Sequence, residues 1–156
     1  MVIAILATPL HAYSAARVSI DTLVEKQEVS VVNGTRQTRF IETGEATPGD
    51  TLRFTLLFRN SGDAVAEDVL LSNPIPENSL YLDGSATSYE GALPLFSIDG
   101  GLSFKKPSLL TYEIKTPDGG VEKKVASPEK YTHIRWQLPP LQAGATGQVS
   151  FNVQIQ

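Results

Sequence analysis

The chain has 156 residues and a mass of 16.9 kDa, which supports one compact domain with a real core and leaves little room for a second. Hydrophobic residues make up 41% and charged residues 19%, a composition typical of a globular protein. The absence of cysteine excludes a thiol nucleophile, a disulfide and a cysteine-ligated zinc, and the formal charge of −4 disfavours nucleic-acid binding, which needs dense Lys and Arg.

The first sixteen residues have the outline of a secretory signal peptide. Residues 2–10 are a short apolar run, and residues 11–16 are rich in small side chains before the chain becomes polar at Arg17. Small residues at positions −3 and −1 allow cleavage before Ala15 or before Arg17. A buried first strand or helix is the alternative interpretation. We predict that residues 1–16 are a signal peptide, with cleavage near residues 14–16.

The remaining residues, 17–156, are predicted to form a single β-sandwich domain that is exported to the periplasm, the cell surface or the extracellular space. No later stretch approaches the roughly 20 apolar residues that a membrane-spanning helix needs. We therefore expect no transmembrane segment in the mature chain.

A β-hairpin is predicted near the start of this domain. Asn33-Gly34 separates two segments of strand-like composition, residues 28–32 and 35–41. This dipeptide supplies the two positive φ angles of a type I′ turn, which is the common connection between two antiparallel strands. We expect the hairpin to be an N-terminal extension of the main sandwich.

Three further segments alternate apolar and polar residues with a period of two: 51–59, 133–138 and 148–156. Each would bury one face, as strands of antiparallel sheets do. Turn residues flank or separate them, including Pro48-Gly49-Asp50, Asp118-Gly119-Gly120 and Pro139-Pro140. The pattern predicts an all-β fold, a two-sheet antiparallel sandwich of about seven to ten strands.

A series of motifs within residues 44–156 resembles a known family of bacterial repeats. The series is, in chain order, residues 48–62 (PGDTLRFTLLFRNSG), 64–71 (AVAEDVLL), 74–81 (PIPENSLY), 84–86, 134–144 (IRWQLPPLQAG) and 149–153. It resembles the conserved repeat domain of unknown function number eleven, which is widespread in envelope and surface proteins. The resemblance implies an immunoglobulin-like sandwich in an exported, non-catalytic module.

The segment from about residue 88 to 130 is a long insertion relative to that family pattern, and it carries the predicted partner contacts. The predicted contact residues are Tyr89, Lys105, Lys106, Tyr112, Lys115, Lys123 and Lys124. Exposed tyrosines and lysines on a loop, together with edge strands that offer main-chain hydrogen bonds, suit a protein partner in the cell envelope. We predict a module that binds or scaffolds another protein.

Two other functions are possible on the sequence. Ten acidic residues against two arginines between residues 40 and 100 raise a calcium- or glycan-binding alternative, but no Asp-x-Asp-x-Asp-Gly loop is present, and solvated strand faces explain the acids equally well. A hydrolase would use His133, yet strand alternation puts His133 with Arg135 on the face opposite Trp136, which we assign to the core. We therefore predict no catalytic residue, metal or cofactor.

Overall fold

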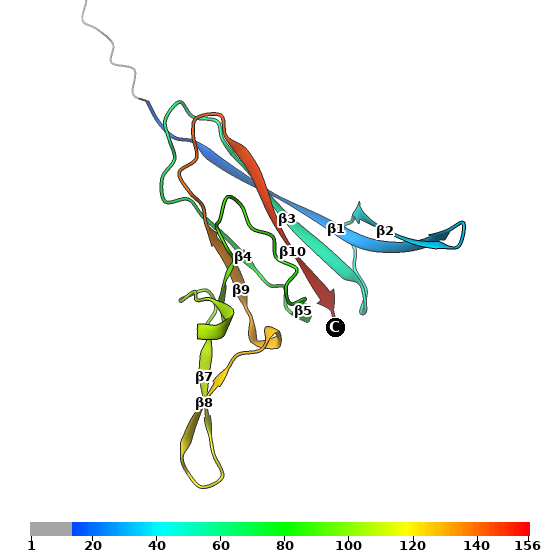
Figure 1. The fold of residues 1–156 in the computed structure, drawn as a ribbon, viewed down its shortest axis with the longest axis vertical. Coiled ribbons are helices and arrows are strands. Elements are labelled where there is room, and N and C mark those ends of the chain that lie inside the picture. Colours follow the sequence, from blue (N-terminus) through cyan, green and yellow to red (C-terminus); the bar gives the residue numbers. More distant parts are fainter. Residues whose placement is uncertain (1–13) are drawn as a thin grey trace, which may run out of the picture.

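The computed structural model describes residues 14–156 and shows an all-β chain (Figure 1). The strands, in chain order, are β1 (Val18–Val32), β2 (Thr35–Glu42), β3 (Thr51–Asn60), β4 (Leu70–Pro74), β5 (Ser79–Tyr81), β6 (Leu95–Ser97), β7 (Thr111–Lys115), β8 (Val121–Val125), β9 (His133–Gln137) and β10 (Thr146–Ile155). Two short 3-10 helices, η1 (Pro107–Leu109) and η2 (Pro128–Lys130), lie in the second half, and no α-helix occurs between residues 14 and 156. The predicted all-β class is confirmed.

All strand pairs are antiparallel, as the alternating sequence pattern predicted. A five-stranded sheet has the order β2-β1-β3-β10-β5, and a three-stranded sheet has the order β4-β9-β6. The third sheet is the β7–β8 hairpin alone. The first two sheets supply the shared core of a β-sandwich.

The core consists of alternate side chains from strands in both of these sheets. Its principal strand residues are Leu52, Leu56 and Phe58 of β3, Val149, Phe151 and Val153 of β10, and Ile134 and Trp136 of β9. Trp136 is fully buried, and its ring centroid lies 6.4 Å from that of Phe151 in the other sheet. The indole N–H donates to the carbonyl of Thr87 at 2.8 Å, so the one polar atom of this side chain has a partner. The assignment of Trp136 to the core is confirmed.

Strand β1 has two partners along its length. Its first part pairs with β3, from Val18 opposite Asn60 to Lys26 opposite Leu52, and its second part pairs with β2 on the other edge. The β1–β2 hairpin therefore extends beyond the end of β3 and projects from the sandwich (Figure 1). We refer to residues 25–42 as the arm.

The turn at the end of the arm has the predicted geometry. Asn33 and Gly34 both have positive φ angles, 52° and 76°. These are the two left-handed positions of a type I′ turn, which is the turn that matches the twist of the two strands. The predicted N-terminal hairpin is confirmed.

Residues 88–130 contribute to both the sandwich and a second projection. Strand β6 pairs with β9 in the three-stranded sheet, so this part of the segment belongs to the core. The β7–β8 hairpin lies beyond it and extends away from the sandwich (Figure 1). Leu110 and Ala126, at the base of this hairpin, are buried and joined by a hydrogen bond from Ala126 N to Leu110 O of 2.7 Å.

Most of the predicted signal peptide, residues 1–13, lies outside the described residues. Ser14, Ala15 and Ala16, the residues at the two predicted cleavage positions, are described and exposed. Between residues 14 and 156, no helix has the length and apolar character needed to cross a membrane.

Replacement of Trp136 tests the core. Trp136→Ala is expected to destabilise the fold by about 3–5 kcal/mol because it leaves a large cavity between the sheets. Denaturant unfolding followed by circular dichroism measures the change. Leu102→Ala, at a side chain that is 88% exposed, is the matched control and is expected to stay within about 0.5 kcal/mol of the native chain. Equal losses in the two variants would contradict this assignment of the core.

Candidate protein-binding site

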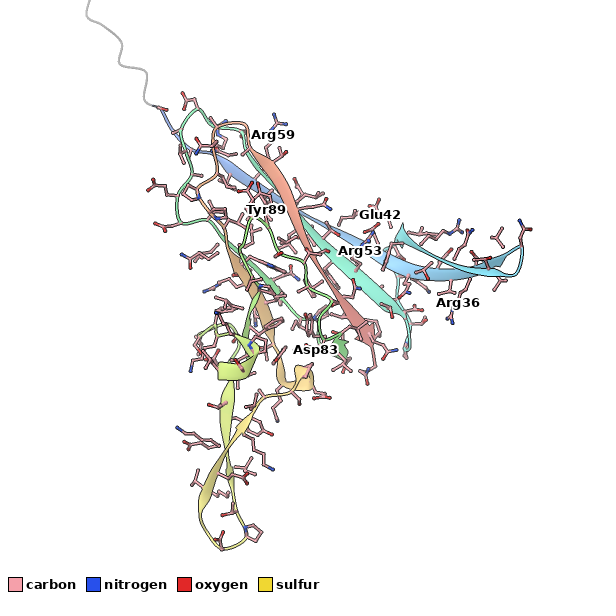
Figure 2. All side chains as sticks on the ribbon, in the orientation of Figure 1. Arg36, Glu42, Arg53, Arg59, Asp83 and Tyr89 are labelled. Carbon is pink, nitrogen blue, oxygen red and sulfur yellow. The ribbon has the colours of Figure 1, made fainter. Side chains whose placement is uncertain are left out.

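The seven predicted contact residues do not form one surface. Tyr89 lies apart from the β7–β8 hairpin, beside the sandwich (Figure 2), and its ring packs edge-on against Phe58 with centroids 4.9 Å apart. Gly147 makes room for this contact, since a Cβ there would lie 2.5 Å from the Tyr89 ring. Burial raises the pKa of the Tyr89 hydroxyl, and the neighbouring Glu90 carboxylate raises it further. Tyr89 is thus part of the packing rather than an open contact.

Lys105 and Lys106 lie between β6 and η1. The main chain of Lys105 forms an isolated bridge to Phe96, and Lys106 lines an open groove of about 430 Å³ with Asp83 and Leu93. The groove also borders the buried ring of Phe96. Both lysine side chains are exposed, at some distance in the chain from the hairpin lysines.

The other four predicted residues do share the β7–β8 hairpin. Tyr112 lies opposite Lys124, and Glu113 lies opposite Lys123 at 4.0 Å, a long and exposed ion pair. The Lys130 ammonium lies 4.4 Å from the centre of the Tyr112 ring, which also packs against the core cluster. Tyr112 is therefore already covered within the chain, whereas the lysines face solvent.

The arm exposes apolar side chains that the sequence analysis did not single out. Val29 and Val31 lie on one face and Val32 and Ile41 on the other, with exposed fractions between 38% and 71%. The order of the five-stranded sheet makes β2 its edge, so the outer main-chain groups of β2 have no strand beside them among residues 14–156. The arm therefore combines apolar side chains with an open strand edge.

Arg53 of β3 joins both strands of the arm where they leave the sandwich (Figure 2). Its Nε and Nη2 atoms each lie 2.8 Å from Oε2 of Glu25 in β1. Its guanidinium also lies over the Phe40 ring of β2, 3.9 Å from the ring centre. Because Glu25 and Arg53 are directly opposite in the β1–β3 register, the contact follows from the strand pairing itself. Arg53 thus fixes the direction in which the arm projects.

A second contact holds the arm on the opposite face of β1. The Lys26 ammonium lies 2.8 Å from Oδ2 of Asp50, and the same oxygen accepts hydrogen bonds from the amide and hydroxyl of Thr47 at 2.8 and 2.9 Å. The Lys26 hydrogen bond is the main cause, and the Thr47 amide the next, of a fall in the Asp50 pKa from 3.8 to about 2. Ion pairs therefore fix the base of the arm on both faces.

His133 is half-buried and lies opposite Ser97 in the β6–β9 register. Its Nδ1 lies 3.2 Å from the hydroxyl of the adjacent Thr132, and its ring is packed against Gly101. The nearest buried hydroxyl in the register, that of Ser97, donates to Asp99 at 2.6 Å and accepts from the Gly101 amide at 2.9 Å. Ser97 is completely buried, so a substrate could not reach this hydroxyl.

The acidic residues are used in turns. Hydrogen bonds from Ser103 and Ser97 hold the pKa of Asp99 far below its ordinary value. The side-chain hydroxyl of Thr116 and the backbone amides of the loop lower the pKa of Asp118 in the same way. Within residues 14–156, no three His, Cys, Asp or Glu side chains are grouped closely enough to hold a metal ion.

Comparison with known proteins adds no relative. No family model matches this chain, and neither a curated protein nor a solved structure matches it.

The Asp50 contact predicts a pH dependence. Because the pKa of Asp50 is about 2 in the folded chain and 3.8 ordinarily, its stabilisation is complete above pH 3.8 and is lost as the pH falls toward 2. Asp50→Asn is therefore expected to lower the melting temperature at pH 6, and most of the difference from the native chain should be lost at pH 2. Circular dichroism melts between pH 2 and 6 measure this. A difference that is the same at both ends would contradict it.

Removal of the Arg53 contacts is expected to loosen the arm selectively. Arg53→Met keeps an unbranched apolar side chain but loses the hydrogen bonds to Glu25 and the charge over Phe40. Amides of β2 should exchange with solvent severalfold faster in this variant, while amides of β10 stay within error of the native chain. Hydrogen exchange read by mass spectrometry distinguishes the two strands. A uniform increase over both would mean that Arg53 stabilises the whole fold instead.

Proposed function

We propose that this chain is an exported, non-enzymatic module of a bacterial cell envelope that binds another protein through the arm. Export is supported by the leader-like sequence of residues 1–16. The resemblance of residues 44–156 to the repeat domain of unknown function number eleven, with an immunoglobulin-like sandwich, stays a prediction made on sequence motifs. The case for binding comes from the arm.

The observation that carries the proposal is that the distal arm exposes valines without any covering layer. Val31 is 71% exposed and Val29 is 45% exposed, on the same face of β1 and two residues apart. An isolated two-stranded hairpin is at best marginally stable in water, because it buries too little apolar surface. A partner that covered this face would remove the valines from water, with a gain of about 1 kcal/mol or less for each, because both are already partly buried.

The open edge of β2 adds main-chain hydrogen-bonding groups to the apolar surface of the arm. The β2 main chain presents donors and acceptors along its outer edge, so a strand of the partner could extend the five-stranded sheet. Arg36 and Arg39 lie on β2, and Arg39 is paired with Glu28 at 3.0 Å. Charged side chains on an edge oppose indiscriminate pairing between copies, which favours a partner of matching shape and charge.

Prior fixation of the arm would limit the entropy lost on binding. Arg53 and Asp50 already hold the base of both strands, so the partner would meet a surface whose direction is set. Restricting a binding element before contact improves affinity because fewer conformations are lost at the encounter. The lysines of β7–β8 form a separate projection and serve as a comparison surface.

A site-specific crosslink tests the proposal. A photoreactive amino acid at Val31 is expected to trap one protein of defined mass from the envelope fraction of the source cells. The same group at Lys123 of β8 probes the second projection, and the group at Leu102 is the control, since that side chain is also highly exposed. Absence of a specific adduct at Val31, or the same adducts at Val31 and Leu102, would reject binding through the arm.

Affinity for the trapped protein gives the quantitative test. Val29→Thr with Val31→Thr keeps the β-propensity of the arm but places hydroxyls in the contact. Loss of about 1–2 kcal/mol corresponds to binding weaker by roughly five- to thirtyfold. Val121→Thr with Val125→Thr makes the same chemical change on β8 and is the matched control. Equal affinities for the two double variants would contradict the assignment.

A further inference from the structure

The first described residues lie along the loop that follows β3. Arg17 N donates to Oδ1 of Asn60 at 3.1 Å, and Arg17 O accepts from the Ser61 amide at 2.8 Å. Two residues earlier, Ala15 N donates to Oδ1 of Asp63 at 2.7 Å, and Ala15 O accepts from the Asp63 amide at 3.2 Å. The main chain of residues 15–17 is therefore held as part of the folded domain.

The loop after β3 is held in shape by the buried side chain of Asn60. Asn60 is completely buried, and its Nδ2 donates to the carbonyls of Ala64 and Leu141 at 2.8 and 3.0 Å. Its Oδ1 also accepts from the Gly62 amide. A Cβ on Gly62 would overlap Ala15 O and would lie 2.6 Å from Arg17 N, so only glycine lets the two segments approach this closely.

The backbone nitrogen of Ala15 donates to Asp63. Cleavage before Ala15 would convert this nitrogen into an α-ammonium. In the uncut chain, the Asp63 carboxylate accepts hydrogen bonds from the neutral Ala15 amide and, at 3.2 Å, from the Ser14 hydroxyl. These hydrogen bonds lower the Asp63 pKa. The bond to Asp63 is already strengthened by the charge of the carboxylate, and a positive charge on the Ala15 nitrogen would turn it into an ion pair. Cleavage before Arg17 would instead remove both Ala15 bonds to Asp63 and would place the new charge near the neutral amide oxygen of Asn60.

We propose that the Ser14–Ala15 peptide bond is the processing site and that the mature chain begins at Ala15, with its α-ammonium paired to Asp63. The inference rests on the proposed export. Water adds across the bond in the active site of a leader peptidase: the hydroxyl goes to the carbonyl carbon of Ser14, a proton goes to the Ala15 nitrogen, and the free amine takes up a second proton at neutral pH. Ala12 and Ser14 are the small residues at −3 and −1 that such an enzyme needs.

The first experiment reads the amino terminus of the exported protein. The native gene is expressed with its own leader, and the protein from the exported fraction is analysed by intact mass and by its N-terminal peptide. A chain that begins at Ala15 is expected. A chain that begins at Arg17, or at any other residue, overturns the processing site while leaving export intact. A full-length chain retained in the cytoplasm overturns both the processing site and the proposed export, so the two failures are distinguishable.

Two matched variants separate the two possible cuts. Ala12→Arg places a large charged residue at −3 of the cut before Ala15 and leaves Ser14 and Ala16 available for the cut before Arg17. Ala16→Arg blocks that second cut and leaves Ala12 and Ser14 unchanged. Cleavage before Ala15 is expected to be lost in the first variant and kept in the second. The reverse result overturns the proposal.

The ion pair itself is tested on the mature protein. An amine-reactive label applied at pH 7 is expected to modify the Ala15 amine severalfold faster in Asp63→Asn than in the native chain, because the free amine is no longer held as a paired ammonium. Lys123, whose side chain is 71% exposed, is the internal reference and should react equally in both. Asp63→Glu, which keeps the charge, should restore most of the protection. Equal labelling of Ala15 in the native chain and in Asp63→Asn, with both chains folded by circular dichroism, would overturn the pairing with Asp63.

Discussion

The structure depends on the packing of β9 against β3 and β10. Trp136 reaches across from the smaller sheet to Phe151, and Phe151 in turn stacks on Phe54 with ring centroids 5.3 Å apart. These side chains lie on alternate positions of long antiparallel strands, so they bring the two sheets together over a continuous apolar layer. Both projections leave the sandwich from strands or loops that this layer holds in place.

The arm is an extension of the same sheet beyond the reach of its core. Strand β1 is longer than the part of it that β3 covers, so its second half has β2 as a neighbour but no second sheet packed against either face among residues 14–156. Hydrophobic burial therefore cannot hold this part. Polar contacts at the base take that role, with Arg53 and Glu25 on one face and Lys26 and Asp50 on the other. Ion pairs thus orient the arm, and its exposed valines are not needed to hold it in place.

Much of the fold could be predicted from local patterns. The alternation in residues 51–59 and 148–156, and the turn at Asn33-Gly34, each depend on contacts close in the chain or on one buried face. The sequence pattern does not predict the start of β1 at Val18, because the first half of this strand is largely exposed and has no clean alternation. Thr55 differs from its sequence pattern in the opposite direction, since this polar residue is buried. It lies between Leu23 and Ser150 in the middle of a sheet face.

The contact surface was harder to predict than the fold. Tyrosines and lysines in one stretch of sequence suggested one surface, but Tyr89 packs on Phe58 and Tyr112 lies under Lys130. Such partners are distant in the sequence or depend on a hairpin register, so composition cannot reveal that a side chain is already covered. The apolar arm was overlooked for the same reason. Its valines resemble those of any half-buried strand in the sequence, and the structure shows that no layer formed by residues 14–156 covers them.

Strand β1 connects the two proposed features. At its first end, the main chain of residues 15–17 is bound to the loop around Asn60 and Gly62, and at its second end it becomes the arm. Between these ends, a row of hydrogen bonds joins β1 to β3. A pull along β1 from the arm would load many of these hydrogen bonds together. A mature chain that begins at Ala15 would keep the anchor at the first end. A partner bound at the second end would then be tied to the core through one continuous strand.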